Sequence, residues 1–142
     1  MKQNRLKVKI ASYLLLQRKS RILMTRRFNT GWSDGMYSLP SGHIDQGEFP
    51  LETIVREAEE EVNVQINPMT TELVHIHFQK DTYVDFYFRT QEWQGEIKIN
   101  EPDKCDKIVW VELNEIDNLE IPEKIKTALS FIAKGEFYSQ GD

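Results

Sequence analysis

The stretch that decides the fold is GHIDQGEFPLETIVREAEEEVNV, residues 42–64. A helix rotates about 100° per residue, so Glu57, Glu60 and Glu61 are expected to share one face. A separate apolar stripe suits packing against a sheet, and it consists of Leu51, Ile54, Val55, Ala58 and Val62. Like charges at this spacing repel by roughly 0.2–0.5 kcal/mol per pair, and they lie at the negative end of the helix dipole. The acidic face therefore predicts a site for a hard divalent cation such as Mg²⁺, which prefers carboxylate oxygens.

The same stretch resembles the signature of the Nudix hydrolase family, Gly-x5-Glu-x7-Arg-Glu-U-x-Glu-Glu-x-Gly-U, where U is a bulky aliphatic residue. The matching positions are Gly42, Glu48, Arg56, Glu57, Glu60, Glu61 and Val64. Ala58 is small for the first U position, and Asn63 replaces the second Gly of the signature. Asn is second to Gly in adopting the left-handed conformation that ends a helix. We therefore expect Asn63 to keep the turn at a small cost in stability.

The rest of the chain alternates strand and helix patterns. Strands are predicted over residues 8–16, 21–27, 36–39, 71–78, 82–93 and 108–111. Helices are predicted in the acidic stretch, from Pro50 onward, and over residues 121–134. Since 142 residues suffice for one core, we expect a single domain spanning residues 1–142. The resemblance implies the Nudix fold, an α/β (α+β) arrangement with a mixed β-sheet sandwiched between α-helices.

Composition excludes several classes of protein. The chain has 18 basic and 23 acidic residues and a net charge of −5, which argues against binding a nucleic-acid backbone. Cys105 is the only cysteine, so no intramolecular disulfide can form and a reducing compartment is expected. The apolar run at residues 13–16 is too short for a signal sequence or a membrane span. We expect a cytoplasmic protein without a membrane or nucleic-acid partner.

The resemblance implies an enzyme that hydrolyses a nucleoside diphosphate linked to another group, using Mg²⁺, with Mn²⁺ as the alternative ion. The implied metal ligands are the Gly42 carbonyl, Glu57, Glu60 and Glu61. Glu57 could instead be the general base, and Glu101, outside the signature, is the other candidate. Arg56 is expected to orient carboxylates by pairing with Glu60 or Glu48.

The segment Asn100–Asp106, NEPDKCD, resembles MutT-like nucleoside triphosphate pyrophosphohydrolases. The leading interpretation is a (d)NTP pyrophosphohydrolase that releases pyrophosphate and acts on standard, oxidised or other non-standard nucleotides. A nucleotide sugar, ADP-ribose or a dinucleoside polyphosphate is the alternative small-molecule substrate. A catalytically silent nucleotide-binding regulator is the alternative of another class, but such a protein usually loses the acids that are intact here. A homodimer is common among relatives of this kind.

Weaker signals lie outside the acidic helix. Arg27, His43 and Trp32 are candidate substrate contacts, and Phe28 and Tyr37 are further aromatic side chains that could stack on a base. Surface solvation or packing is the alternative for each of them. The last two candidates are His75 and His77, which lie two apart on one face of a predicted strand. They could bind metal, contact substrate, or simply be hydrogen-bonded at the sheet surface.

Overall fold

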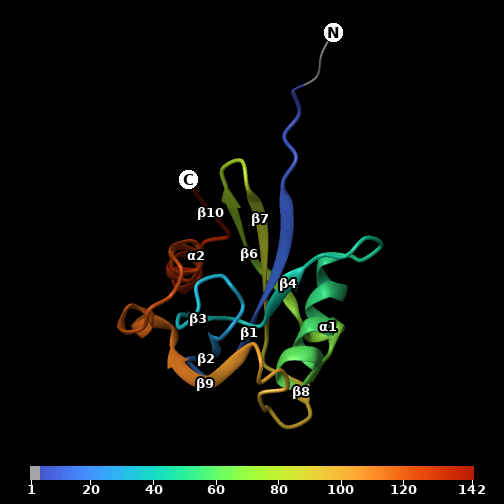
Figure 1. Cartoon of the computed structure of the whole chain (residues 1–142), viewed down its shortest axis with the longest axis vertical. Helices are drawn as coiled ribbons and strands as arrows, with labels where there is room; N and C mark the ends of the chain where they lie inside the picture. Colours follow the sequence, from blue (N-terminus) through green and yellow to red (C-terminus); the bar gives the residue numbers. More distant parts are fainter. Residues whose placement is uncertain (1–3) are drawn as a thin grey trace.

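The computed structural model describes residues 4–142 and consists of a mixed sheet between two helices (Figure 1). The strands are β1 (Lys9–Arg18), β2 (Arg21–Arg27), β3 (Tyr37–Ser38), β4 (Ser41–His43), β5 (Gln65–Ile66), β6 (Glu72–Gln79), β7 (Tyr83–Thr90), β8 (Trp93–Gln94), β9 (Cys105–Glu112) and β10 (Tyr138–Gly141). The helices are α1 (Pro50–Val62) and α2 (Glu123–Ala133), with short 3₁₀ turns at Pro68–Thr70 and Leu113–Asn118. The predicted mixed sheet between helices is confirmed.

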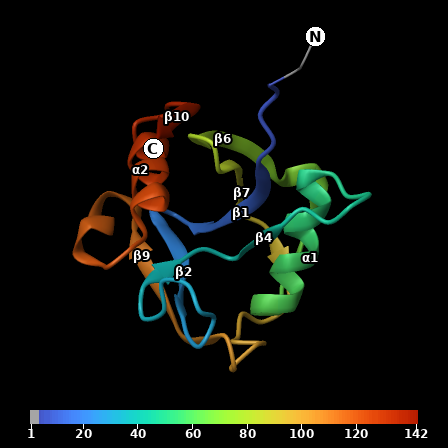
Figure 2. The same cartoon turned by 45° about the horizontal axis from the view of Figure 1, so that its top comes forward.

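Strand β1 is the centre of the sheet. It pairs in parallel with β7 along residues 9–16, while β4 pairs antiparallel with residues 11–13 and β2 with residues 17–18. The strand order is β10-β6-β7-β1-β2-β3, with β4 joined to β1 and β9 joined to β2. β1 thus pairs with β7 along most of its length, and with β4 and then β2 at successive positions (Figure 2).

The two helices cover opposite faces of the sheet (Figures 1 and 2). Alternate residues of β1 point to each side: Tyr13 and Leu15 belong to the core under α2, and Leu14 and Leu16 to the core under α1. All four are buried, and burying a leucine stabilises the fold by about 1.5–3 kcal/mol. Because both faces are covered, β1 has an unbroken apolar run instead of an alternating pattern.

The acidic helix begins and ends as its sequence predicts. Pro50 is its first residue, and the Glu52 carboxylate accepts the Phe49 N–H at 2.8 Å. Asn63 follows the last turn with φ of 67°, in the left-handed region. Its side chain also donates to the Glu96 carbonyl at 3.0 Å, a contact that a glycine could not make. Asn63 thus joins the end of α1 to the loop that follows β8.

Several short elements differ from the sequence prediction. Residues 82–93 were expected to be one strand, but β7 ends at Thr90, and the strand predicted at residues 108–111 extends over Cys105–Glu112. Strands β4, β5, β8 and β10 were not anticipated, since two to four residues carry no usable periodicity. The predicted helix at 121–134 starts at Glu123, after Pro122. Within residues 4–142, no helix is long and apolar enough to cross a membrane.

We predict that Asn63→Val destabilises the protein by about 1–2 kcal/mol. A β-branched residue is strained in the left-handed region, and the hydrogen bond to the Glu96 carbonyl is lost. Asn63→Gly relieves the backbone but loses the same hydrogen bond, so its free energy of unfolding should stay within about 1 kcal/mol of wild type. Urea unfolding of the three proteins measures both effects. Equal stability of the Val and Gly variants would contradict this account.

Candidate active site

The site begins where β4 meets α1. A Cβ placed on Gly42 would lie 2.7 Å from Cγ of Glu57, closer than real Cβ contacts come. Strand β4 can therefore approach the acidic face of α1 because residue 42 has no side chain. The same strand is held to β1 by antiparallel pairing at Ala11–Tyr13. The glycine that opens the sequence signature thus brings the backbone of β4 against the helical carboxylates.

Glu61 is the most strongly perturbed carboxyl group of the site. The Ser41 N–H donates to its Oε2 at 2.9 Å. Burial raises the pKa of Glu61 well above its usual value, and the neighbouring charges of Glu57 and Glu101 raise it further. The pKa of Glu57 is raised as well, mainly by burial, although Arg56 opposes the shift. Three carboxylates therefore share a partly buried space in which positive charge is favourable.

Arg56 organises the other side of the acidic helix. Its Nε and one terminal nitrogen donate to Glu48 at 2.8 and 3.0 Å, and the other donates to Glu57 at 2.7 Å and Glu60 at 3.3 Å. The hydrogen bonds from Arg56 lower the pKa of Glu48 to about 2. The Glu60 side chain is 49% exposed, whereas that of Glu57 is 15% exposed. Arg56 thus pairs with both expected partners and with Glu57 as well.

The donor set fits a divalent cation, although the carboxylates are not yet converged. Within residues 4–142, no three His, Cys, Asp or Glu side chains lie together as a metal site. Glu57 and Glu61 instead bond to Arg56 and to the Ser41 N–H, respectively. Both could turn toward a common ion, and their raised pKa values indicate that each ionised form lacks full charge compensation. Hard oxygen donors of this kind suit Mg²⁺ or Mn²⁺.

Asn100 makes contacts to the acidic helix that sequence reasoning missed. Its Nδ2 donates to the Glu59 carbonyl at 3.1 Å and its N–H to the Glu61 carbonyl at 3.0 Å. Both carbonyls lie in the last turn of α1, where the Glu59 carbonyl also accepts the Asn63 N–H at 3.1 Å and Asn100 supplies the partner of the Glu61 carbonyl. Asn100 therefore caps the acidic helix and brings the adjacent Glu101 next to Glu61. The only sequence signal was the resemblance of Asn100–Asp106 to MutT-like proteins.

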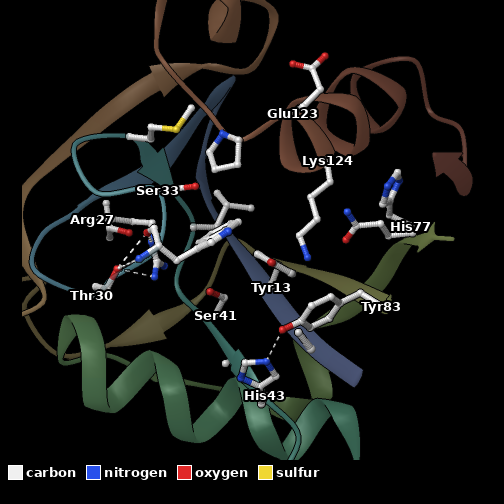
Figure 3. Close-up of a pocket in the computed structure, with 18 of the residues that line it drawn as sticks. Tyr13, Arg27, Thr30, Ser33, Ser41, His43, His77, Tyr83, Glu123 and Lys124 are labelled. Carbon is white, nitrogen blue, oxygen red and sulfur yellow. Dashed lines mark hydrogen bonds between the residues drawn. The ribbon is translucent and has the colours of Figure 1, made fainter. Parts of the chain in front are cut away.

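A cleft of about 1190 Å³ extends from the acidic helix to the start of α2 (Figure 3). Of the predicted site residues, those that line it are Arg27, Trp32, Gly42, His43, Glu61, His77 and Glu101. The Arg27 guanidinium donates to the Trp32 carbonyl at 2.7 Å and lies 4.7 Å from the centroid of its ring. The His43 ring nitrogen lies 2.7 Å from the Tyr83 hydroxyl. The predicted aromatic residues Phe28 and Tyr37 do not line the cleft.

His75 and His77 form a buried hydrogen-bonded cluster instead of converging on the carboxylates. Nε2 of His75 and Nδ1 of His77 each lie 2.7 Å from the Ser139 hydroxyl, and Nδ1 of His75 lies 2.9 Å from the Glu136 carbonyl. Burial lowers the pKa of His77 to about 4. The two histidines thus connect β10 to β6. This arrangement agrees with the interpretation that both rings are hydrogen-bonded within the sheet.

A second charged pair escaped the sequence analysis. Nζ of Lys124 on α2 lies 3.2 Å from Oδ2 of Asp85, whose side chain is 0% exposed. The sequence contained one signal: Asp85 is two residues from Tyr83 and two from Tyr87 along β7, so the three side chains share one face of the strand. That face points to α2, and a carboxylate on it requires a cationic partner.

Comparison with known proteins places this geometry in a family. The family model for the NUDIX domain matches residues 6–132, so the chain belongs to the Nudix family. It is 28% identical, over 106 residues that cover 68% of this chain and 71% of the relative, to the asymmetrical bis(5'-nucleosyl)-tetraphosphatase of Mus musculus. The family match and its hydrolase-named relative support a Nudix pyrophosphohydrolase.

Two solved structures share the fold. The MutT NUDIX hydrolase of Burkholderia pseudomallei superposes with a TM-score of 0.73 at 22% identity, over 87% of this chain and 97% of that one. An ADP-ribose pyrophosphatase of Streptococcus suis gives 0.66 at 16% identity, over 95% of this chain and all of that one (100%). At such identities the likeness concerns the arrangement of strands and helices.

We predict that Glu61→Gln stabilises the metal-free protein. The folded state raises the pKa of Glu61, so ionisation of this group opposes folding once the pH exceeds the unfolded value of about 4.3. Removing the charge should raise Tm at pH 8 by about 2–4 °C, corresponding to about 1 kcal/mol. Melting curves with EDTA from pH 4 to 8 should show the advantage growing with pH. A variant that is less stable than wild type at pH 8 would contradict the electrostatic argument.

Proposed function

We propose that this protein is a Mg²⁺-dependent hydrolase that cleaves a nucleoside triphosphate into a monophosphate and pyrophosphate. The observation that supports it is the placement of Glu61 and Glu101 at one end of a nucleotide-sized cleft, with Glu57 one helical turn from Glu61 and close enough to raise its pKa. Phosphates bring negative charge to an acidic site, so they require an intervening cation. A divalent ion held here would offset the phosphate charge and activate a water molecule.

Each residue has a distinct role in this proposal. Glu57, Glu61 and the Gly42 carbonyl hold the ion, with Glu60 at the exposed edge as a ligand or as an acceptor for a bound water. Arg56 keeps Glu57 and Glu60 in place through the hydrogen bonds described above. Glu101 is the general base, because it is free of the Arg56 network and lines the cleft. It takes a proton from the water whose oxygen bonds to one phosphorus of the P–O–P linkage, while the bond from that phosphorus to the bridging oxygen breaks and monophosphate and pyrophosphate separate.

A dinucleoside polyphosphate is the second candidate substrate. The observation that favours it is the 28% identity to the asymmetrical bis(5'-nucleosyl)-tetraphosphatase of the mouse. The cleft of about 1190 Å³ is large enough for more than one nucleoside. The triphosphate interpretation rests on the Asn100–Asp106 segment, whose first residue caps the acidic helix. A panel containing NTPs, diadenosine tetraphosphate and ADP-ribose separates these classes.

We predict Mg²⁺-dependent pyrophosphate release from at least one nucleoside triphosphate, abolished by EDTA. Glu61→Gln should lower kcat by about 100-fold or more, since a neutral amide is a poorer Mg²⁺ ligand. Glu59→Gln is the matched control, because that side chain is exposed on the same helix and makes no side-chain contact with the site. Steady-state kinetics on a verified substrate measures both variants. Near wild-type turnover of the Glu61 variant would remove this residue from the proposed metal site.

A further inference from the structure

The end of the cleft farthest from the acidic helix is formed around Lys124 (Figure 3). Its ammonium lies 3.2 Å from Oδ2 of Asp85 and 3.9 Å from the centroid of the Tyr83 ring. The Lys124 side chain is 12% exposed and that of Asp85 is fully buried. Tyr83 is itself held by His43, whose Nε2 lies 2.7 Å from its hydroxyl. The lysine is therefore fixed between a carboxylate and an aromatic face.

This environment changes what the ammonium can recognise. Asp85 compensates its charge, so Lys124 attracts a phosphate less strongly than a free lysine would. The group nevertheless keeps three N–H donors and has no acceptor. Asp85 and Tyr83 occupy two of its sides, and the remaining side faces the cleft that Lys124 lines. A ligand at this position must consequently offer an acceptor.

The part of a nucleotide that reaches Lys124 is the base. This inference rests on the proposed function. If the phosphates lie at the carboxylates, the nucleoside must extend toward α2. The walls there are largely apolar or aromatic, formed by Tyr13, Trp32, Met36, Leu39 and Pro122. Such surfaces suit a planar ring, while a few fixed polar groups orient it. Lys124 is one of these polar groups.

We propose that Lys124 is a specificity-determining residue that selects nucleobases with a carbonyl oxygen over those with an amino group at the same ring position. A carbonyl oxygen accepts the free N–H of the ammonium. An amino group places its own N–H donors against a donor, leaving both groups unsatisfied in a partly buried site. A site built around a buried polar group discriminates strongly against a ligand that cannot pair with it.

Two matched pairs of substrates test the proposal. ITP and ATP differ in carbonyl against amino at C6, as UTP and CTP do at C4. For wild type we expect kcat/KM to favour each carbonyl member by about tenfold or more. In the double variant Asp85→Asn with Lys124→Gln, an amide that both donates and accepts replaces the ammonium without leaving a buried charge. The preference should then fall to about threefold or less, whereas Lys124→Arg, which also only donates, should keep it.

Three results would overturn the proposal: equal kcat/KM within both wild-type pairs, an unchanged preference in the double variant, or an equal loss for all four substrates. The last result would make Lys124 a phosphate contact. If wild type hydrolyses none of the four, the wider NTP panel decides the proposed function, and calorimetric binding of IMP and AMP decides this inference separately. Tighter binding of IMP, lost in the double variant, would support it, and equal or absent binding would overturn it.

Discussion

The structure depends on holding two carboxylates together at the junction of β4 and α1. Glu57 and Glu61 lie one helical turn apart, and Gly42 lets a strand backbone close over the first of them. The resulting burial raises the pKa of both groups, which means that ionising them opposes folding. The packing of α1 against the sheet uses its apolar stripe, which borders the face that carries the two carboxylates and does not require charge there. Like-charged carboxylates held together at a cost in stability are expected at a functional site.

Hydrogen bonds around the carboxylates keep their mutual repulsion from unfolding α1. Arg56 neutralises the outer carboxylates, and Asn100 caps the last turn, where the helix dipole disfavours the acids. Arg56 would also compete with a cation for Glu57, since it already donates to one oxygen of that carboxylate. Because it has Glu48 as a second partner at 2.8 and 3.0 Å, it keeps an anchor when Glu57 turns away. The arginine can thus support the metal-free site without blocking the loaded one.

The sequence predicted the parts of the fold that repeat a pattern. The long strands, both helices and the left-handed turn at Asn63 follow from periodicity and capping rules, and these predictions are confirmed. The short strands β4 and β10 could not be predicted, because their pairing partners are distant in the chain and their composition is not that of a strand. The same reason hid the cap made by Asn100 and the ion pair of Asp85 with Lys124. Each is a contact between segments that only the closed sheet brings together.

One strand coordinates the two ends of the cleft. On β1, the Ser12 hydroxyl donates to the Pro50 carbonyl at 2.8 Å, which fixes the start of the acidic helix. The next residue, Tyr13, points to the other face, where it lines the cleft and lies 5.9 Å from the ammonium of Lys124. Neighbouring residues of a strand point to opposite faces, so a single buried strand sets both helices at a fixed separation. The distance between the carboxylate end and the lysine end is therefore a property of the core, so changes in the loops around the cleft can alter the ligand without moving the reacting groups.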